Sequence, residues 1–217
     1  MTAPKRILTT VSEIPSPRGN KRLRHARREI AAEAARIMAT QSQNNFRIAK
    51  QKAAQRLGIN YRQAMPSNVE IETALRAYQD FYGGQQHINQ IQRFREIALR
   101  VMRSLESFCP RLVGPVLEGT ADKHARVSLH IFNDPPDAVV MHLLDKGLEF
   151  FNEQRKIRWH DGSYRMVPLI ITNTEEVTIE LSLFHSVDLR QAPPSPVDGR
   201  PQKRARVYEV ECLLAGA

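Results

Sequence analysis

The chain has 217 residues, of which 41% are hydrophobic and 25% are charged, proportions that resemble those of folded globular proteins. These values exclude an intrinsically disordered chain, and the length suffices for one good core or for a helical region joined to one compact domain. No apolar run approaches the roughly 20 residues of a membrane-spanning helix, and the N-terminus lacks the apolar segment of a secretory signal. We therefore expect a cytoplasmic protein with no membrane partner.

The formal net charge of +9 is concentrated in the N-terminal third of the chain. Up to Met65, only Glu13, Glu29 and Glu33 oppose a long series of lysines and arginines. A positive field of this kind attracts a polyanion, either nucleic acid or an acidic protein, although a solvated helix face is the ordinary alternative. The residues expected to contact nucleic acid are Arg22, Arg24, Arg27, Arg28, Arg47 and Lys50.

Cys109 and Cys212 are the two cysteines of the chain. They are too few for a disulfide scaffold and have no second pair with which to build a zinc site. A reducing compartment fits this usage. We expect both side chains to be small buried residues near the ends of helices.

A helical region precedes the first predicted strand. Residues 1–20, rich in proline and polar residues, are expected to form a mobile basic arm, and residues 21–110 a helical basic region. Apolar residues at helical spacing predict helices at about 22–40, from Asn45 to a stop at Gly58, from a cap at Ser67 or Asn68 to Tyr82, and from Ile88 to Phe108, the longest of the four.

From Leu112 the apolar period changes to that of strands. We expect strands at 112–118, 127–133, 148–151, 166–172 and 177–184, with a helix at 135–146, and the last two strands should form a hairpin. Residues 111–190 would then form a small mixed-sheet domain, followed over residues 191–217 by a proline-rich loop and a C-terminal helix or strand. The predicted fold class is α/β (α+β), with the helical region first.

One motif spans the first two predicted strands. The run Val113-Gly114-Pro115-Val116-Leu117-Glu118-Gly119-Thr120 precedes Arg126-Val127-Ser128-Leu129-His130-Ile131-Phe132. This pattern resembles the opening of the nucleotidyltransferase domain of the DNA polymerase beta superfamily, where a Gly-Ser turn precedes a strand with two metal-binding aspartates. Gly119-Thr120 resembles that turn, and Ile179-Glu180-Leu181 resembles the strand of the third carboxylate.

Shorter matches lie elsewhere in the chain. Ala49-Lys50, Arg56-Leu57-Gly58 and Asp198-Gly199-Arg200-Pro201 are similar to segments of an uncharacterised proteobacterial family labelled as nucleotidyltransferase-like. The similar regions are 31–57, 66–78 and 189–206. Together they extend the resemblance over most of the chain.

The resemblance implies nucleotidyl transfer, in which a loop holds a triphosphate and carboxylates fix two Mg²⁺ ions. It implies that Gly119, Thr120, Lys123 and Arg126 contact phosphate and that Glu180 is a catalytic metal ligand, with Mg²⁺ as the cofactor if the site is active and none otherwise. The paired aspartate positions, however, fall on Arg126 and Ser128, and neither is an anionic ligand.

Three hypotheses on function follow. The first is a nucleotide-binding, nucleotidyltransferase-like protein whose transferase activity is weak or lost. The second is a non-enzymatic nucleic-acid-binding or regulatory protein that uses the arginine-rich helices. The third is a homo-oligomeric protein-interaction module whose helix at 88–108 packs inside the chain or against a second copy.

Overall fold

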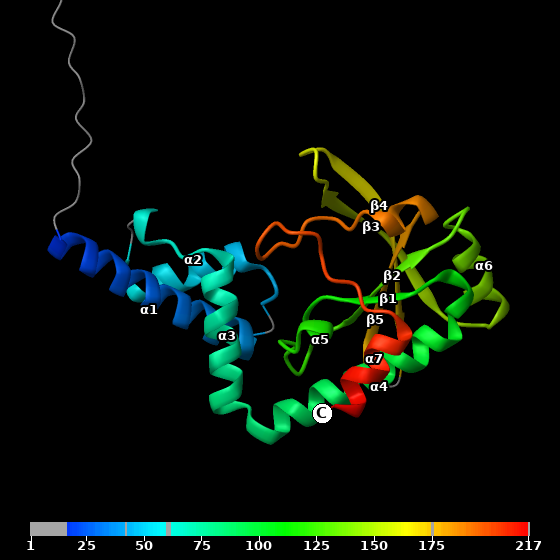
Figure 1. Ribbon diagram of the computed structural model, residues 1–217, viewed down its shortest axis with the longest axis horizontal. Helices are drawn as coiled ribbons and strands as arrows, with labels where there is room; N and C mark the ends of the chain where they lie inside the picture. The colour runs from blue at the N-terminus through cyan, green and yellow to red at the C-terminus, as the bar shows by residue number, and fades with distance from the viewer. Residues whose placement is uncertain (1–16, 42, 60–61, 175, 217) are drawn as a thin grey trace, which may run out of the picture.

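The structure, a computed structural model, describes residues 17–41, 43–59, 62–174 and 176–216. Its helices are α1 (Pro17–Gln41), α2 (Phe46–Leu57), α3 (Asn68–Tyr82), α4 (Gly84–Ser104), α5 (Pro115–Glu118), α6 (Ala138–Asp145) and α7 (Val207–Ala215). Its strands are β1 (Arg111–Val113), β2 (Val127–Phe132), β3 (Phe150–Arg158), β4 (Tyr164–Asn173) and β5 (Thr178–Phe184). The chain therefore has the predicted α/β class, with helices first and a mixed sheet after them (Figure 1).

Local capping fixes the ends of α2 and α3. The side chain of Asn45 accepts hydrogen bonds from the backbone N–H groups that begin α2, and Gly58 ends this helix in the left-handed conformation at φ 65°. Ser67 and Glu70 form a reciprocal capping box at the start of α3. These ends confirm the predicted helix boundaries to within about a residue.

The first three helices pack around a core of their own. Ile30 and Ile37 of α1, Ala53 of α2 and Ile71 of α3 are fully buried in it. The alanine-rich face of α1 lets the helices approach closely, and α3 crosses α1 (Figure 1). The first turns of α1 extend outward from this crossing.

The sheet has the strand order β1-β2-β5-β4-β3. β2 and β5 are parallel, whereas the other neighbours are antiparallel, so the sheet is mixed. β4 and β5 form the predicted hairpin around the segment after Asn173. The central strand β5 is buried along nearly its whole length.

Helices cover one face of this sheet. Leu129 of β2 and Leu181 of β5 point to that face and share a core with α4, α5, α6 and α7. Phe94 and Met102, on the apolar stripe of α4, are buried in the same core. The stripe that raised the hypothesis of an oligomer thus packs inside the chain.

Several predicted boundaries were wrong. The first strand ends at Val113, because Gly114 turns the chain at φ 73° and Pro115 begins α5. The longest helix is α1, with 25 residues, and it begins at Pro17, inside the predicted arm; residues 1–16 of that arm lie outside the described residues. Both Cys109 and Cys212 are exposed, contrary to prediction.

Among the described residues, no helix is long and apolar enough to cross a membrane.

Replacement of Ile71 by alanine tests the core of the first three helices. Because Ile71 is fully buried, Ile71→Ala should lower the free energy of unfolding by about 2–5 kcal/mol, measured by urea unfolding. The matched control is Val69→Ala on the same helix, whose side chain is 46% exposed and whose loss should change stability by less than about 0.5 kcal/mol. Equal losses in both variants would contradict this account of the core.

Candidate functional site

The face of the sheet opposite the helices, which we call the polar face, carries Ser128, Glu180 and Arg155. Ser128 on β2 is paired in register with Glu180 on β5, and Glu180 is paired with Ile171 on β4. Alternate residues of a strand point to opposite faces, so Ser128 and Glu180 lie on one face while Leu129 and Leu181 lie on the other. The parallel pairing of β2 and β5 thus brings Glu180 beside the start of β2.

Two arginines enclose the carboxylate of Glu180. Arg126 Nη1 donates to Glu180 Oε1 at 2.9 Å, and Arg155 Nη2 donates to Glu180 Oε2 at 2.6 Å. Ser128 Oγ also donates to Oε2, at 3.4 Å. The Glu180 side chain is only 8% exposed, whereas Arg126 and Arg155 are 52% and 41% exposed. The carboxylate therefore lies beneath two guanidinium groups that face solvent.

The protonation of Glu180 follows from these contacts. Burial raises the pKa of the carboxyl, but hydrogen bonds and charge from Arg155 and Arg126 outweigh burial, and the resulting pKa lies below the usual value. Glu180 is accordingly ionised at neutral pH.

These residues do not fit a divalent cation. Mg²⁺ takes oxygen ligands in near-octahedral geometry, and both oxygens of Glu180 already accept from guanidinium groups. A cation at this carboxylate would be repelled by two neighbouring positive charges. Within the described ranges, no group of three His, Cys, Asp or Glu side chains is arranged to hold a metal ion. The metal-ligand role expected for Glu180 conflicts with this geometry.

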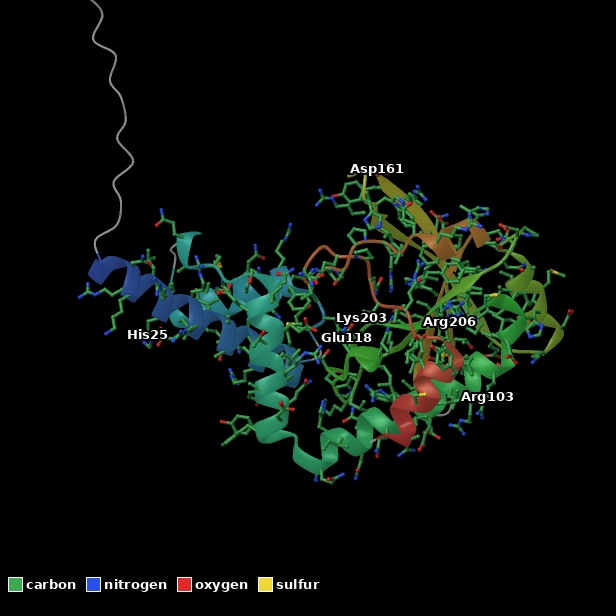
Figure 2. All side chains as sticks on the ribbon, in the orientation of Figure 1. His25, Arg103, Glu118, Asp161, Lys203 and Arg206 are labelled. Atoms are coloured by element: carbon green, nitrogen blue, oxygen red, sulfur yellow. The ribbon has the colours of Figure 1, made fainter. Side chains whose placement is uncertain are left out.

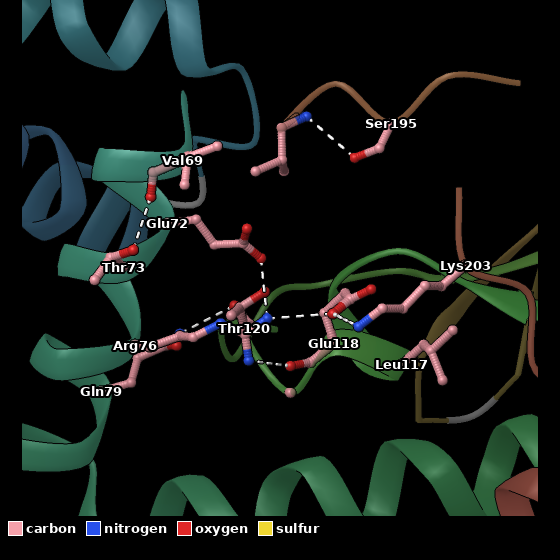
Figure 3. A network of polar contacts seen from close by, with 12 residues as sticks. Val69, Glu72, Thr73, Arg76, Gln79, Leu117, Glu118, Thr120, Ser195 and Lys203 are labelled. Atoms are coloured by element: carbon pink, nitrogen blue, oxygen red, sulfur yellow. Dashed lines mark hydrogen bonds and ion pairs between the residues drawn. The ribbon is translucent and has the colours of Figure 1, made fainter. Parts of the chain in front are cut away.

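The predicted phosphate loop at Gly119 and Thr120 is also corrected. Their backbone N–H groups both donate to the carbonyl of Pro115, so these amides are not available to a phosphate. Their carbonyls contact α3 and α4: Gln79 Nε2 donates to Thr120 O at 3.0 Å, and His87 Nε2 lies 3.0 Å from Gly119 O. Figure 3 shows Gln79 reaching Thr120.

The neighbouring carbonyls of α5 are enclosed in the same way. Arg76 donates to Glu118 O at 2.8 Å, and Arg95 donates to Val116 O and Leu117 O. Figure 3 shows Arg76 beside Glu118. The segment that the motif predicted to hold a triphosphate is therefore a junction between α5 and the helices before it.

The remaining predicted phosphate ligands lie near β2. Arg126 contacts Glu180 directly, as described above. Lys123 is exposed in the turn before β2, where the Asp122 side chain accepts the backbone N–H of His124 at 3.0 Å. Of the residues that the motif singled out, the structure brings Arg126, Ser128 and Glu180 together.

Sequence reasoning missed Arg155. The third strand was predicted to end at Phe151, but β3 runs to Arg158. The charged run 153–156 concealed this strand, although Phe151, Ile157 and Trp159 keep a period of two that could have revealed it. Arg155 points to the same face as these residues and so reaches Glu180.

A half-buried arginine, Arg204, lies at the other end of this face. Arg204 Nε donates to His130 Nδ1 at 3.2 Å, Arg204 Nη1 donates to Asp188 O at 2.8 Å, and the guanidinium lies 4.8 Å from the ring centroid of Phe132. Burial, with the charge of Arg204, lowers the pKa of His130 to about 3, so this imidazole stays neutral and accepts. The C-terminal loop is thereby fixed over Phe132, while the Glu180 end stays open.

The predicted nucleic-acid ligands on α1 and α2 divide into two groups. Arg27 donates to Gln63 O at 2.7 Å and Lys50 donates to Pro66 O at 2.8 Å, so both help to hold the helical region together. Burial lowers the pKa of Lys50. The side chains exposed to solvent are Arg22, Arg24, Arg28 and Arg47.

No protein-family model matches the chain, and no curated protein matches it significantly.

The ion pairs of Glu180 predict an acid-sensitive contribution to stability. Glu180→Gln should lower the free energy of unfolding at pH 7 by about 1–3 kcal/mol, because charge-assisted hydrogen bonds are lost. The folded pKa lies below the unfolded value of about 4.3, so this contribution is complete above that value and disappears as the pH falls through the folded pKa.

Urea unfolding of both proteins between about pH 7 and pH 3 measures this contribution. The stability difference should be constant down to about pH 5 and then shrink. Glu153→Gln removes an exposed carboxylate of β3 and serves as the control, with little effect expected at any pH. A difference that persists undiminished at pH 3 would refute the assignment.

Proposed function

We propose that the protein binds nucleic acid through the basic surface of α1 and α2, and that a nucleotidyltransferase-like sheet domain without transferase activity serves as its scaffold. The distribution of charge carries this proposal. Residues 17–83 contain thirteen Lys and Arg against five Asp and Glu, whereas from residue 84 onward seventeen of each kind balance. The uncompensated charge of the described chain thus belongs to residues 17–83, which include α1, α2 and α3.

The position of the basic residues on α1 supports a role in ligand binding rather than a purely structural role. Lys21, Arg24 and Arg28 recur at helical spacing on one face, away from the buried Ile30. The first turn of α1 has no acidic residue. Lys21, Arg24 and Arg28 lie beyond this first turn, where the macrodipole has little effect. Like charges at i and i+4, as in Arg24 and Arg28, cost about 0.2–0.5 kcal/mol, so helix stability does not account for them. Bound phosphates would offset this cost.

Nucleic acid is favoured over an acidic protein because the exposed cations are mostly arginines along a single projecting helix. Figure 1 shows that the first turns of α1 extend beyond α2 and α3, so a groove or a strand can reach them. Arginine forms bidentate hydrogen bonds with phosphate oxygens, and phosphate contacts supply most of the affinity of non-specific binding.

Transferase activity has weaker support. The carboxylate Glu180 has two arginine partners, and the amides of Gly119 and Thr120 are bonded within the chain. Neither feature suits a magnesium-dependent reaction on a triphosphate. The nucleotidyltransferase-like resemblance therefore supports the scaffold more than the chemistry.

The salt dependence of binding tests the proposal. We expect the full chain to bind a labelled DNA duplex or RNA hairpin, with the logarithm of affinity falling linearly with the logarithm of salt concentration, measured by fluorescence anisotropy. The triple variant Arg22→Glu, Arg24→Glu, Arg28→Glu should reduce affinity by about a hundredfold or more and lower the salt slope by about 3. Arg27 is left intact because it contacts Gln63.

A charge-matched control separates this surface from general electrostatics. Lys146→Glu, Arg158→Glu, Arg190→Glu reverses the same number of exposed charges outside the helical region. This control should retain most of the affinity, and circular dichroism should show that both triple variants fold. Equal losses in the two triple variants, or binding that is indifferent to salt, would exclude the proposed surface.

A further inference from the structure

The polar face of the sheet carries a second concentration of positive charge. Arg126 and Arg155 both contact Glu180, so this cluster has one net positive charge beside a half-open surface. We propose that Arg126 and Arg155 form a metal-independent binding site for a phosphate group, with Glu180 as their shared counter-ion. This inference does not depend on nucleic-acid binding by α1, because its residues lie on the sheet.

The geometry suits one bridging phosphate. The contacts of 2.9 Å and 2.6 Å join the two guanidinium groups to the two oxygens of a single carboxylate. They hold the guanidinium groups near enough for one tetrahedral anion to contact both. Each guanidinium has five N–H donors, and the exposed parts of Arg126 and Arg155 direct further donors to solvent. Charge-assisted hydrogen bonds of this kind are among the strongest available to phosphate.

Glu180 prepares the site before the ligand arrives. A free arginine side chain loses considerable rotamer entropy when it binds, but Arg126 and Arg155 are already oriented by the buried carboxylate. Ser128 Oγ donates a further hydrogen bond to the same carboxylate. Because the arginines supply the positive charge, phosphate binding here requires no divalent cation.

Neighbouring residues limit the ligand. Phe151 is 67% exposed and lies in the same register row as Ile171 and Glu180, so its ring offers a stacking surface beside the charged cluster. Glu153 is exposed between Phe151 and Arg155 on the same face of β3 and opposes ligands of high charge. A single phosphate carrying an aromatic base fits these surroundings better than a triphosphate.

Isothermal titration of the full chain with inorganic phosphate and with AMP, both in EDTA, tests the site. We expect saturable binding of AMP that is unchanged when Mg²⁺ replaces EDTA. Arg126→Gln and Arg155→Gln should each weaken this binding by about tenfold, which corresponds to one charge-assisted hydrogen bond. Glu180→Gln, which releases both arginines from the carboxylate that orients them, should also weaken it.

Arg158→Gln is the matched control for Arg155→Gln. It removes an exposed arginine from the same strand, and its residue points to the opposite face of β3. This variant and the α1 triple variant should both bind AMP normally. Thermal unfolding of each variant checks that the fold is retained.

Two comparisons of ligands identify the kind of molecule that carries the phosphate. Tighter binding of AMP than of inorganic phosphate identifies a free nucleotide, whereas a preference for a 5′-phosphorylated over a 5′-hydroxyl oligonucleotide in the α1 triple variant identifies a nucleic-acid end. Either result supports the site. Absence of phosphate binding by every probe, a requirement for Mg²⁺, or an equal loss in Arg158→Gln would overturn it.

Discussion

A buried carboxylate in the central strand of the sheet constrains the polar face more than any other group. Glu180 lies on β5 with neighbouring strands on both sides, and an ionised carboxylate in that position needs compensating charge and hydrogen bonds. Arg126 comes from the start of β2, and Arg155 comes from the edge strand β3. Removal of either partner would leave part of this charge uncompensated.

The reach of Arg155 has a consequence for the shape of the sheet. Arg155 is paired with Val167, whereas Glu180 is paired with Ile171, four residues further along β4. In a flat sheet this offset is about 13 Å along the strand, in addition to the width of two strands. A contact of 2.6 Å therefore requires the β3–β4 hairpin to twist and curve toward this face. The bend of this hairpin and the Arg155–Glu180 ion pair therefore depend on each other.

The helical region and the sheet domain are joined by the carbonyl groups around α5. A helix end leaves carbonyls without intrahelical partners, and here side chains of α3 and α4 supply the donors. Glu118 adds ion pairs to Arg76 of α3 and to Lys203 of the C-terminal loop, and Figure 2 shows Glu118 and Lys203 between the helices and the sheet. Asn68 also donates to Pro196 O. These contacts hold the basic helices in a defined position relative to the sheet.

The sequence predicted the helix ends that are determined by local capping interactions. Asn45, Gly58 and Ser67 located the ends of α2 and α3 because capping involves only neighbouring backbone groups. The first strand was predicted to turn at Gly119, whereas the chain turns at Gly114. Both glycines have positive φ, and only tertiary contacts distinguish the one that ends the strand from the one that ends α5. Arg155 was missed because its partner, Glu180, is 25 residues away. The charge of Arg155 also made its segment look unlike a strand.

The two positive regions differ in how their charge is compensated. In the sheet domain arginines have carboxylate partners, as in the contacts of Arg103 with Glu211 and of Arg165 with Asp188. Such exposed pairs add little stability, yet they cancel the field at a distance. On α1 the exposed arginines outnumber nearby acids, so their field extends into solvent. We therefore assign the proposed long-range attraction of a polyanion to the helices, whereas the proposed phosphate site needs a ligand in direct contact with Arg126 and Arg155.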